Sequence, residues 1–173
     1  MKGRTKLRHQ GYRDPLLVEV MKSHGFEKIP LYEHRAPETM AIRNGWRDQA
    51  NLRDGPVNSV PVEFSDPSEV SKLIKEKARA LGADDVGIAR LTPVMINKEA
   101  DLPHEFVICM LISEDYAETR GGPRAIENEA MHSYAACVDI STRLAEYIRS
   151  LGYPALAHHN GGCDVQAVPA MYA

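Results

Sequence analysis

The spacing of apolar residues divides the chain into an irregular first part and a regular second part. Residues 1–64 are rich in Pro, Arg and Asn and show no sustained period, apart from a short helix-like run at 16–21. From residue 65 onward, apolar positions recur at helical spacing or gather into short runs typical of strands. The pattern predicts an irregular N-terminal extension over 1–64 and one α+β domain over 65–173.

Two complete helices are predicted in the second part. Asp66 is a suitable N-cap, Pro67 fits the first helical position and Glu69 completes a capping box, so a helix begins here and ends at Gly82. A longer helix is predicted over residues 125–151. Its buried stripe would comprise Ile126, Ala130, Tyr134, Val138, Leu144, Ile148 and Leu151.

Three short runs predict strands, at residues 85–90, 106–112 and 153–157. The second run is continuously apolar, which is typical of a central strand of a sheet. The third run leads into a glycine-containing loop, and a final helix begins near residue 165 without a cap or turn after it. We therefore expect helices flanking a sheet, in a domain that is incomplete.

Charge and composition exclude several classes of protein. A net charge of -3 over 173 residues supplies no excess of positive charge for binding nucleic acid. The longest apolar run is shorter than the roughly 20 residues that cross a bilayer, and the basic N-terminus leads into no signal segment. We predict a cytoplasmic protein with neither a nucleic-acid nor a membrane partner.

The three cysteines are odd in number and widely spaced, at Cys109, Cys137 and Cys163. This spacing favours neither a disulfide framework nor a metal motif. We interpret Cys109 and Cys137 as small buried hydrophobic residues and predict no metal site.

Four blocks between residues 66 and 173 carry a resemblance to a known family. They are 74–89 (IKEKARALGADDVGIA), 110–116 (MLISEDY), 133–136 (SYAA) leading to 144–155 (LAEYIRSLGYPA), and 157–162 (AHHNGG) followed by 168–173 (VPAMYA). In this order they resemble the cobalamin-dependent, iron–sulfur reductive dehalogenases. The first block is also similar to the related epoxyqueuosine reductases.

The resemblance implies a corrinoid held in a nitroreductase-like fold, with cobalt that is reduced by two iron–sulfur clusters and removes halogen from an organohalide. Two four-iron clusters need eight thiolates, and this chain has three cysteines. We therefore expect the corrinoid-binding portion of such an oxidoreductase, truncated before the iron–sulfur part and inactive alone. It would need a separate electron-transfer partner, or would form a homo-oligomer that covers its sheet edge.

Two alternatives stay open at this point. One is a non-catalytic corrinoid-binding or self-associating module. The other is a flavin-dependent oxidoreductase of nitroreductase-like fold.

Candidate cofactor-binding residues follow from the chemistry of a corrinoid, whose amide side arms need backbone and amide hydrogen bonds. Gly161 and Gly162 also permit backbone shapes closed to other residues. The predicted set is His158, Asn160, Gly161, Gly162 and Gln166. Because adjacent strand residues face opposite ways, we expect one of His158 and His159 to line the pocket and the other to face solvent.

Tyr116 and Tyr134 are candidate proton donors, because a phenol near a reducing centre can protonate a developing carbanion. The alternatives are a core position for Tyr134 and a loop position for Tyr116. Asp164 is interpreted as a cap of the final helix, with an acid–base role as the alternative. Trp46, the only tryptophan, is expected to anchor the N-terminal extension to a surface.

Overall fold

The computed structural model describes residues 36–97, 100–159 and 164–165. The chain divides into two units, 1–35 and 36–173, and the described residues belong to the second. The helix-like run at 16–21 and the helix predicted after residue 165 lie outside the described residues. The boundary predicted near residue 64 stays a prediction.

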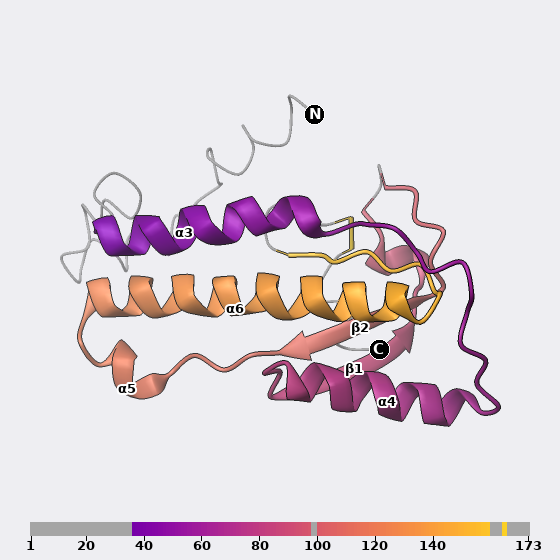
Figure 1. The fold of residues 1–173 in the computed structure, drawn as a ribbon. Coiled ribbons are helices and arrows are strands. Elements are labelled where there is room, and N and C mark those ends of the chain that lie inside the picture. The colour runs from indigo at the N-terminus through magenta and orange to yellow at the C-terminus, as the bar shows by residue number, and fades with distance from the viewer. Residues whose placement is uncertain (1–35, 98–99, 160–163, 166–173) are drawn as a thin grey trace. The chain divides into compact units, whose positions relative to one another are not determined.

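Long helix α6 passes between two other parts of the unit (Figure 1). Helix α3 packs along one side of α6, and α4 with the β1–β2 sheet lies on the other side. The elements, in order, are α3 (Pro37–Gln49), η1 (Ala50–Leu52), α4 (Pro67–Ala80), β1 (Asp85–Arg90), η2 (Pro93–Met95), β2 (Phe106–Leu111), α5 (Tyr116–Thr119) and α6 (Pro123–Ser150). The predicted α+β class is confirmed.

Helix α4 begins and ends where local signals predict. The Asp66 carboxylate accepts a hydrogen bond from the Ser68 amide at 2.8 Å, and Pro67 occupies the first turn. Gly82 ends the helix in a left-handed conformation, with φ 115°. The capping box differs in detail, because the Glu69 carboxylate accepts from the Ser65 hydroxyl at 3.3 Å.

The sheet is a pair of antiparallel strands, in the register Asp85 with Leu111 through Arg90 with Phe106. One face packs on the core through Val86, with Ile88, Ile108 and Met110 beside it. The prediction of a central β2 is wrong for the described sheet, because β1 is its only neighbour there. Phe106 and Leu111, the two end residues of β2, are exposed.

The core joins α4, β1 and the second half of α6. Val138 and Leu144 of the predicted α6 stripe are buried, and Leu144 packs with Ile74, Ala78 and Val86. The prediction is wrong for Ile126 and Tyr134, which are exposed. The buried α6 residues of this cluster are Ile140 and Leu144, and Ala136 is the most N-terminal α6 residue packed against it.

Two further predictions need correction. The extension over 1–64 was expected to be irregular, but α3 lies within it because it packs on α6, where the buried Thr39 hydroxyl bonds to Asn128 at 3.0 Å. Residues 153–157 do not form a strand. In the part of the chain that the structure describes, no strand pairs with them. The Ala157 amide donates instead to the Arg53 carbonyl, and the Ala155 carbonyl accepts from the Arg149 side chain.

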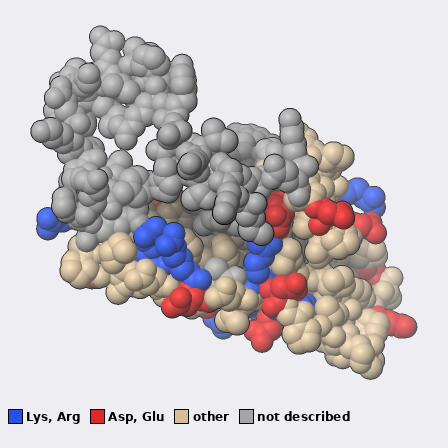
Figure 2. Space-filling view, turned by 90° about the horizontal axis from the view of Figure 1, so that it is seen from above, with Lys and Arg blue, Asp and Glu red and all other residues tan. Residues whose placement is uncertain are grey.

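The described surface mixes charges of both signs. Figure 2 shows Lys and Arg interspersed with Asp and Glu on the visible face, rather than gathered into one field. Among the described residues, no helix is both long and apolar enough to cross a membrane.

Candidate functional site

Three aromatic side chains from distant parts of the sequence meet beside α6. The Trp46 ring of α3 lies 6.4 Å from the ring of Tyr134 in α6 and 6.4 Å from the ring of His159. The Trp46 indole nitrogen is buried and donates to no acceptor among the described residues. A buried donor without an acceptor is costly, so this N–H is available to a ligand that carries an acceptor.

The end of α6 holds the neighbouring segments through Arg149, of which only 5% is exposed. Its Nη1 atom donates to the carbonyls of Ala155, at 2.8 Å, and Arg53, at 3.4 Å. Arg149 belongs to the last turn of α6, where the helix dipole favours a cation. Gly55 leaves room for it, because a Cβ there would lie 3.3 Å from Nε.

The Arg53 carbonyl accepts a hydrogen bond from Arg149, and the Arg53 side chain forms an ion pair with Asp164. Arg53 Nη2 and Asp164 Oδ2 are 2.7 Å apart, and both side chains are about one-third exposed or less. The Asp164 amide donates to Nδ1 of His158 at 3.4 Å. Burial lowers the pKa of His158 below its ordinary value, and the Arg53 charge lowers it further.

The structure places the predicted site residues unevenly. Tyr134 lies in the aromatic cluster and His158 beside Asp164, whereas Tyr116 is 79% exposed on the short helix α5. His158 and His159 contact different neighbours, and both are half-buried, so the expectation that one faces solvent is wrong. The predicted residues Asn160, Gly161, Gly162 and Gln166 lie outside the described residues.

The structure also gives contacts for Asp164, Trp46 and two arginines. The Asp164 carboxylate pairs with Arg53, and the helix that it was expected to cap lies outside the described residues. Trp46 anchors its segment against α6, as expected for a lone large aromatic residue. Arg53 and Arg149 were not predicted. A cation in the last turn of a helix was the only local signal for Arg149, and no local signal marked Arg53.

Cys109 and Cys137 are half-buried rather than buried, and burial raises the pKa of both thiols. In the described ranges, no three His, Cys, Asp or Glu side chains come together to hold a metal ion.

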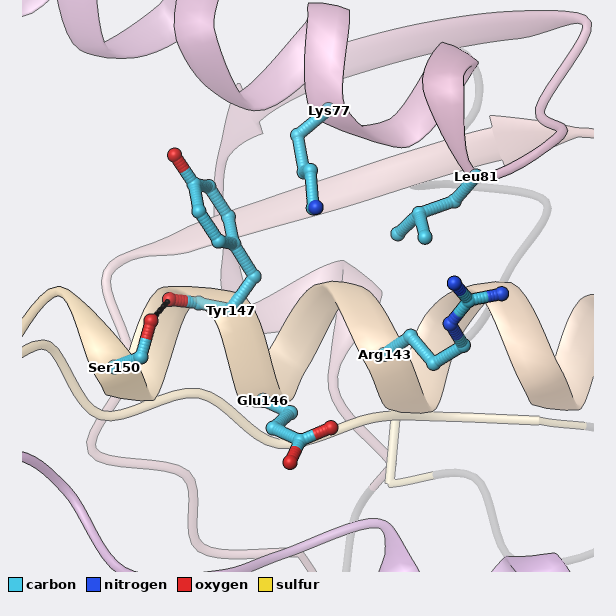
Figure 3. A pocket seen from close by; sticks show the side chains of 6 residues that line it. All are labelled: Lys77, Leu81, Arg143, Glu146, Tyr147 and Ser150. Atoms are coloured by element: carbon cyan, nitrogen blue, oxygen red, sulfur yellow. Dashed lines mark hydrogen bonds between the residues drawn. The ribbon is translucent and has the colours of Figure 1, made fainter.

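Two grooves flank α6. The groove between α3 and α6 has a volume of about 420 Å³ and includes Trp46, Gln49, His132 and Asp139 in its lining. The groove between α4 and α6 has a volume of about 320 Å³, and Figure 3 shows Lys77 of α4 and Leu81, the residue that follows α4, reaching toward α6. There the Lys77 ammonium lies 4.9 Å from the centre of the Tyr147 ring, as a cation–π contact. The aromatic cluster borders the first groove and not the second.

Comparison with solved structures identifies the class of protein that this fold resembles. No protein-family model matches the chain, and no curated protein matches it. Solved reductive dehalogenases do match, which confirms the resemblance seen in the sequence.

A lysine-to-glutamine variant of the catabolic reductive dehalogenase NpRdhA has a TM-score of 0.70 and 25% identity, over 79% of this chain. A structure described as suggesting a mechanism for B12-dependent dehalogenation has a TM-score of 0.68 and 25% identity, over 77%. NpRdhA in complex with 3-bromo-4-hydroxybenzoic acid has a TM-score of 0.68 and 26% identity, also over 77%. The match covers only 22%, 21% and 21% of those chains, respectively.

Proposed function

We propose that this chain forms part of the corrinoid-binding unit of a reductive dehalogenase-like oxidoreductase, which removes halogen from an organohalide by reduction. The observation that carries the proposal is the match to B12-dependent reductive dehalogenase structures over more than three-quarters of the chain. We also propose that β1 and β2 belong to a nitroreductase-like sheet flanked by helices.

The chemistry of the described residues fits a corrinoid. The amide side arms of a corrinoid carry carbonyl oxygens, which accept hydrogen bonds, and the Trp46 indole N–H is a buried donor that has no acceptor among the described residues. The rings of Tyr134 and His159 beside it offer apolar surface for a large planar ligand. We therefore propose that this cluster forms one wall of the cofactor site. His158, Asn160, Gly161, Gly162 and Gln166 would supply further contacts.

When bound, a corrinoid would supply the cobalt chemistry, and the protein would supply orientation and a proton. Tyr134 and Tyr116 remain the proposed proton donors. The position of Tyr134 beside Trp46 and the half-buried His159 supports Tyr134 more strongly than the exposed Tyr116. A phenol placed beside a bound corrinoid could donate a proton to a nearby reacting carbon.

The electrons are proposed to come from iron–sulfur clusters on polypeptide outside these 173 residues. Eight thiolates are needed for two four-iron clusters, and the chain has three cysteines. We therefore propose that the chain binds corrinoid but does not turn over an organohalide by itself.

Titration of cobalamin into the isolated chain tests the proposal. Because Trp46 is the only tryptophan, its fluorescence reports on this cluster alone, and a bound corrinoid should quench it. The cobalamin absorption spectrum gives the affinity independently. Trp46→Phe keeps an aromatic ring but removes the indole donor, and we expect it to weaken binding about fivefold, corresponding to a lost hydrogen bond of about 1 kcal/mol.

Lys77→Ala is the matched control, because Lys77 lies in the groove between α4 and α6, away from the aromatic cluster (Figure 3). It should bind cobalamin as the unmodified chain does, and thermal melting should show that both variants are folded. A folded chain that does not bind cobalamin, or that binds flavin mononucleotide in preference to it, would contradict the proposal. Equal affinity of Trp46→Phe and the unmodified chain would remove the cluster from the site.

A further inference from the structure

Asp164 and Val165 are held to two segments that are distant in sequence. The Asp164 carboxylate pairs with Arg53 at 2.7 Å, and the Asp164 carbonyl accepts from the Asn97 amide at 2.8 Å. Val165 forms an antiparallel bridge with Ile96. We call the contacts of Arg53, Ile96 and Asn97 with Asp164 and Val165 the Asp164 latch.

The closed latch requires a neutral His158. The Asp164 amide donates to Nδ1 of His158, at 3.4 Å, so this nitrogen must carry no proton. An imidazolium has N–H groups at both nitrogens. Protonation would therefore remove the acceptor and leave two N–H groups facing each other.

The charges around His158 also oppose protonation. Burial lowers its pKa most, followed by the positive charge of Arg53, and His104 and His159 lower it further. Asp164 acts in the opposite direction. Its carboxylate is already paired with Arg53 at 2.7 Å, so it offers limited compensation for a second cation nearby.

We propose that His158 is a proton switch for the Asp164 latch, and that its protonation releases Asp164 and Val165 from Ile96, Asn97 and Arg53. The closed state has the lower His158 pKa, so it takes up its proton at a lower pH than the open state. The latch is therefore fully stable above the ordinary value of 6.5 and is weakened as the pH falls from there through the lowered pKa. This inference goes beyond the proposed cofactor role and does not depend on it.

Amide hydrogen exchange, read residue by residue by NMR, tests the switch in the cofactor-free chain. The Asn97 amide is protected by the Asp164 carbonyl when the latch is closed. After correction for intrinsic exchange, we expect its protection factor to fall as the pH is lowered through and below 6.5. Each unit of difference between the open-state and closed-state pKa corresponds to a change in protection of up to about tenfold.

His158→Gln should abolish this dependence, because glutamine keeps a side-chain acceptor and does not titrate. His132→Gln is the matched control, since His132 lies on α6 in the groove with Trp46, and its pH profile should match that of the unmodified chain. The amide of Leu144, a buried core residue within α6, serves as an internal reference for global unfolding. An Asn97 profile that is flat in the unmodified chain, or unchanged in His158→Gln, would overturn the proposal.

Discussion

Gly152 illustrates how one backbone position fixes the connection at the end of α6. It follows the helix in a left-handed conformation, with φ 90°. A Cβ at this position would collide with the backbone and ring of Pro61. The segment around Pro61 is itself held to α6 by the Asn58 and Val62 amides, which donate to the Arg149 and Leu151 carbonyls. Gly152 is therefore required both by its conformation and by its neighbour.

We predict that Gly152→Ala destabilises the fold by about 2 kcal/mol or more, because left-handed backbone costs a Cβ-bearing residue roughly 1–2 kcal/mol and the clash adds to this. The matched control is Gly45→Ala. A Cβ at Gly45 meets nothing within 4 Å, so in helix α3 this change should stabilise by roughly 0.5–1 kcal/mol. Urea denaturation measures both, and a stability of Gly152→Ala equal to that of the unmodified chain would refute the steric argument.

At the residue scale, the sequence predicts which residue types could serve a site better than it predicts which residues contact each other. Tyr134 and His158 were predicted as site residues from their type and setting, and they lie in the aromatic cluster and beside Asp164. Arg53 was not predicted, because its partner Asp164 is 111 residues away and no local pattern links them. Side-chain exposure also depends on the assembled fold, which is why both histidines are half-buried.

Helix α4 shows how far local signals can define an element. Its N-cap, its proline and its terminal glycine are all within a turn of the ends that they define, so they could be predicted from the sequence. The sequence of helix α3 shows no regular stripe of apolar residues, and its packing on α6 decides its structure. Residues 153–157 show the converse, because an apolar run becomes a strand only where another strand can pair with it.

The Asp66 cap gives a prediction for the pH dependence of α4. Hydrogen bonds from the Ser68 hydroxyl and amide lower the pKa of Asp66 below 3.8. Its stabilising contribution is therefore complete above 3.8 and is lost as the pH falls through the lowered pKa. We predict that Asp66→Ala lowers the thermal midpoint at neutral pH, since the Ser68 amide loses its acceptor.

Asp66→Asn is the matched variant, because asparagine also caps helices but does not titrate. It should keep most of the stability at neutral pH and lose less on acidification than the unmodified chain. Melting curves across the acidic range compare the three proteins. An Asp66→Asn profile parallel to that of the unmodified chain would show that Asp66 does not contribute to the acid dependence.

At the scale of the whole molecule, the described fold is one part of a larger architecture in the proteins that it matches. The chain spans about a fifth of the length of the solved reductive dehalogenases. Among the described residues, the sheet is half-buried and both end residues of β2 are exposed, and self-association stays a prediction. The sequence could indicate this resemblance because its four blocks keep their order, which does not require knowledge of long-range contacts.

The cysteines lead to a prediction for the whole chain. Cys109 lies in β2 and Cys137 in α6, both are half-buried, and burial raises the pKa of each thiol, which disfavours the thiolate that binds iron. A single four-iron cluster needs four thiolates, and the chain has three cysteines. We therefore predict that anaerobic reconstitution with iron and sulfide yields no cluster on the isolated chain. A known ferredoxin treated in parallel serves as the positive control. The measurement is visible absorption together with protein-bound iron and acid-labile sulfide, and four of each per folded chain would refute the proposal that the clusters reside elsewhere.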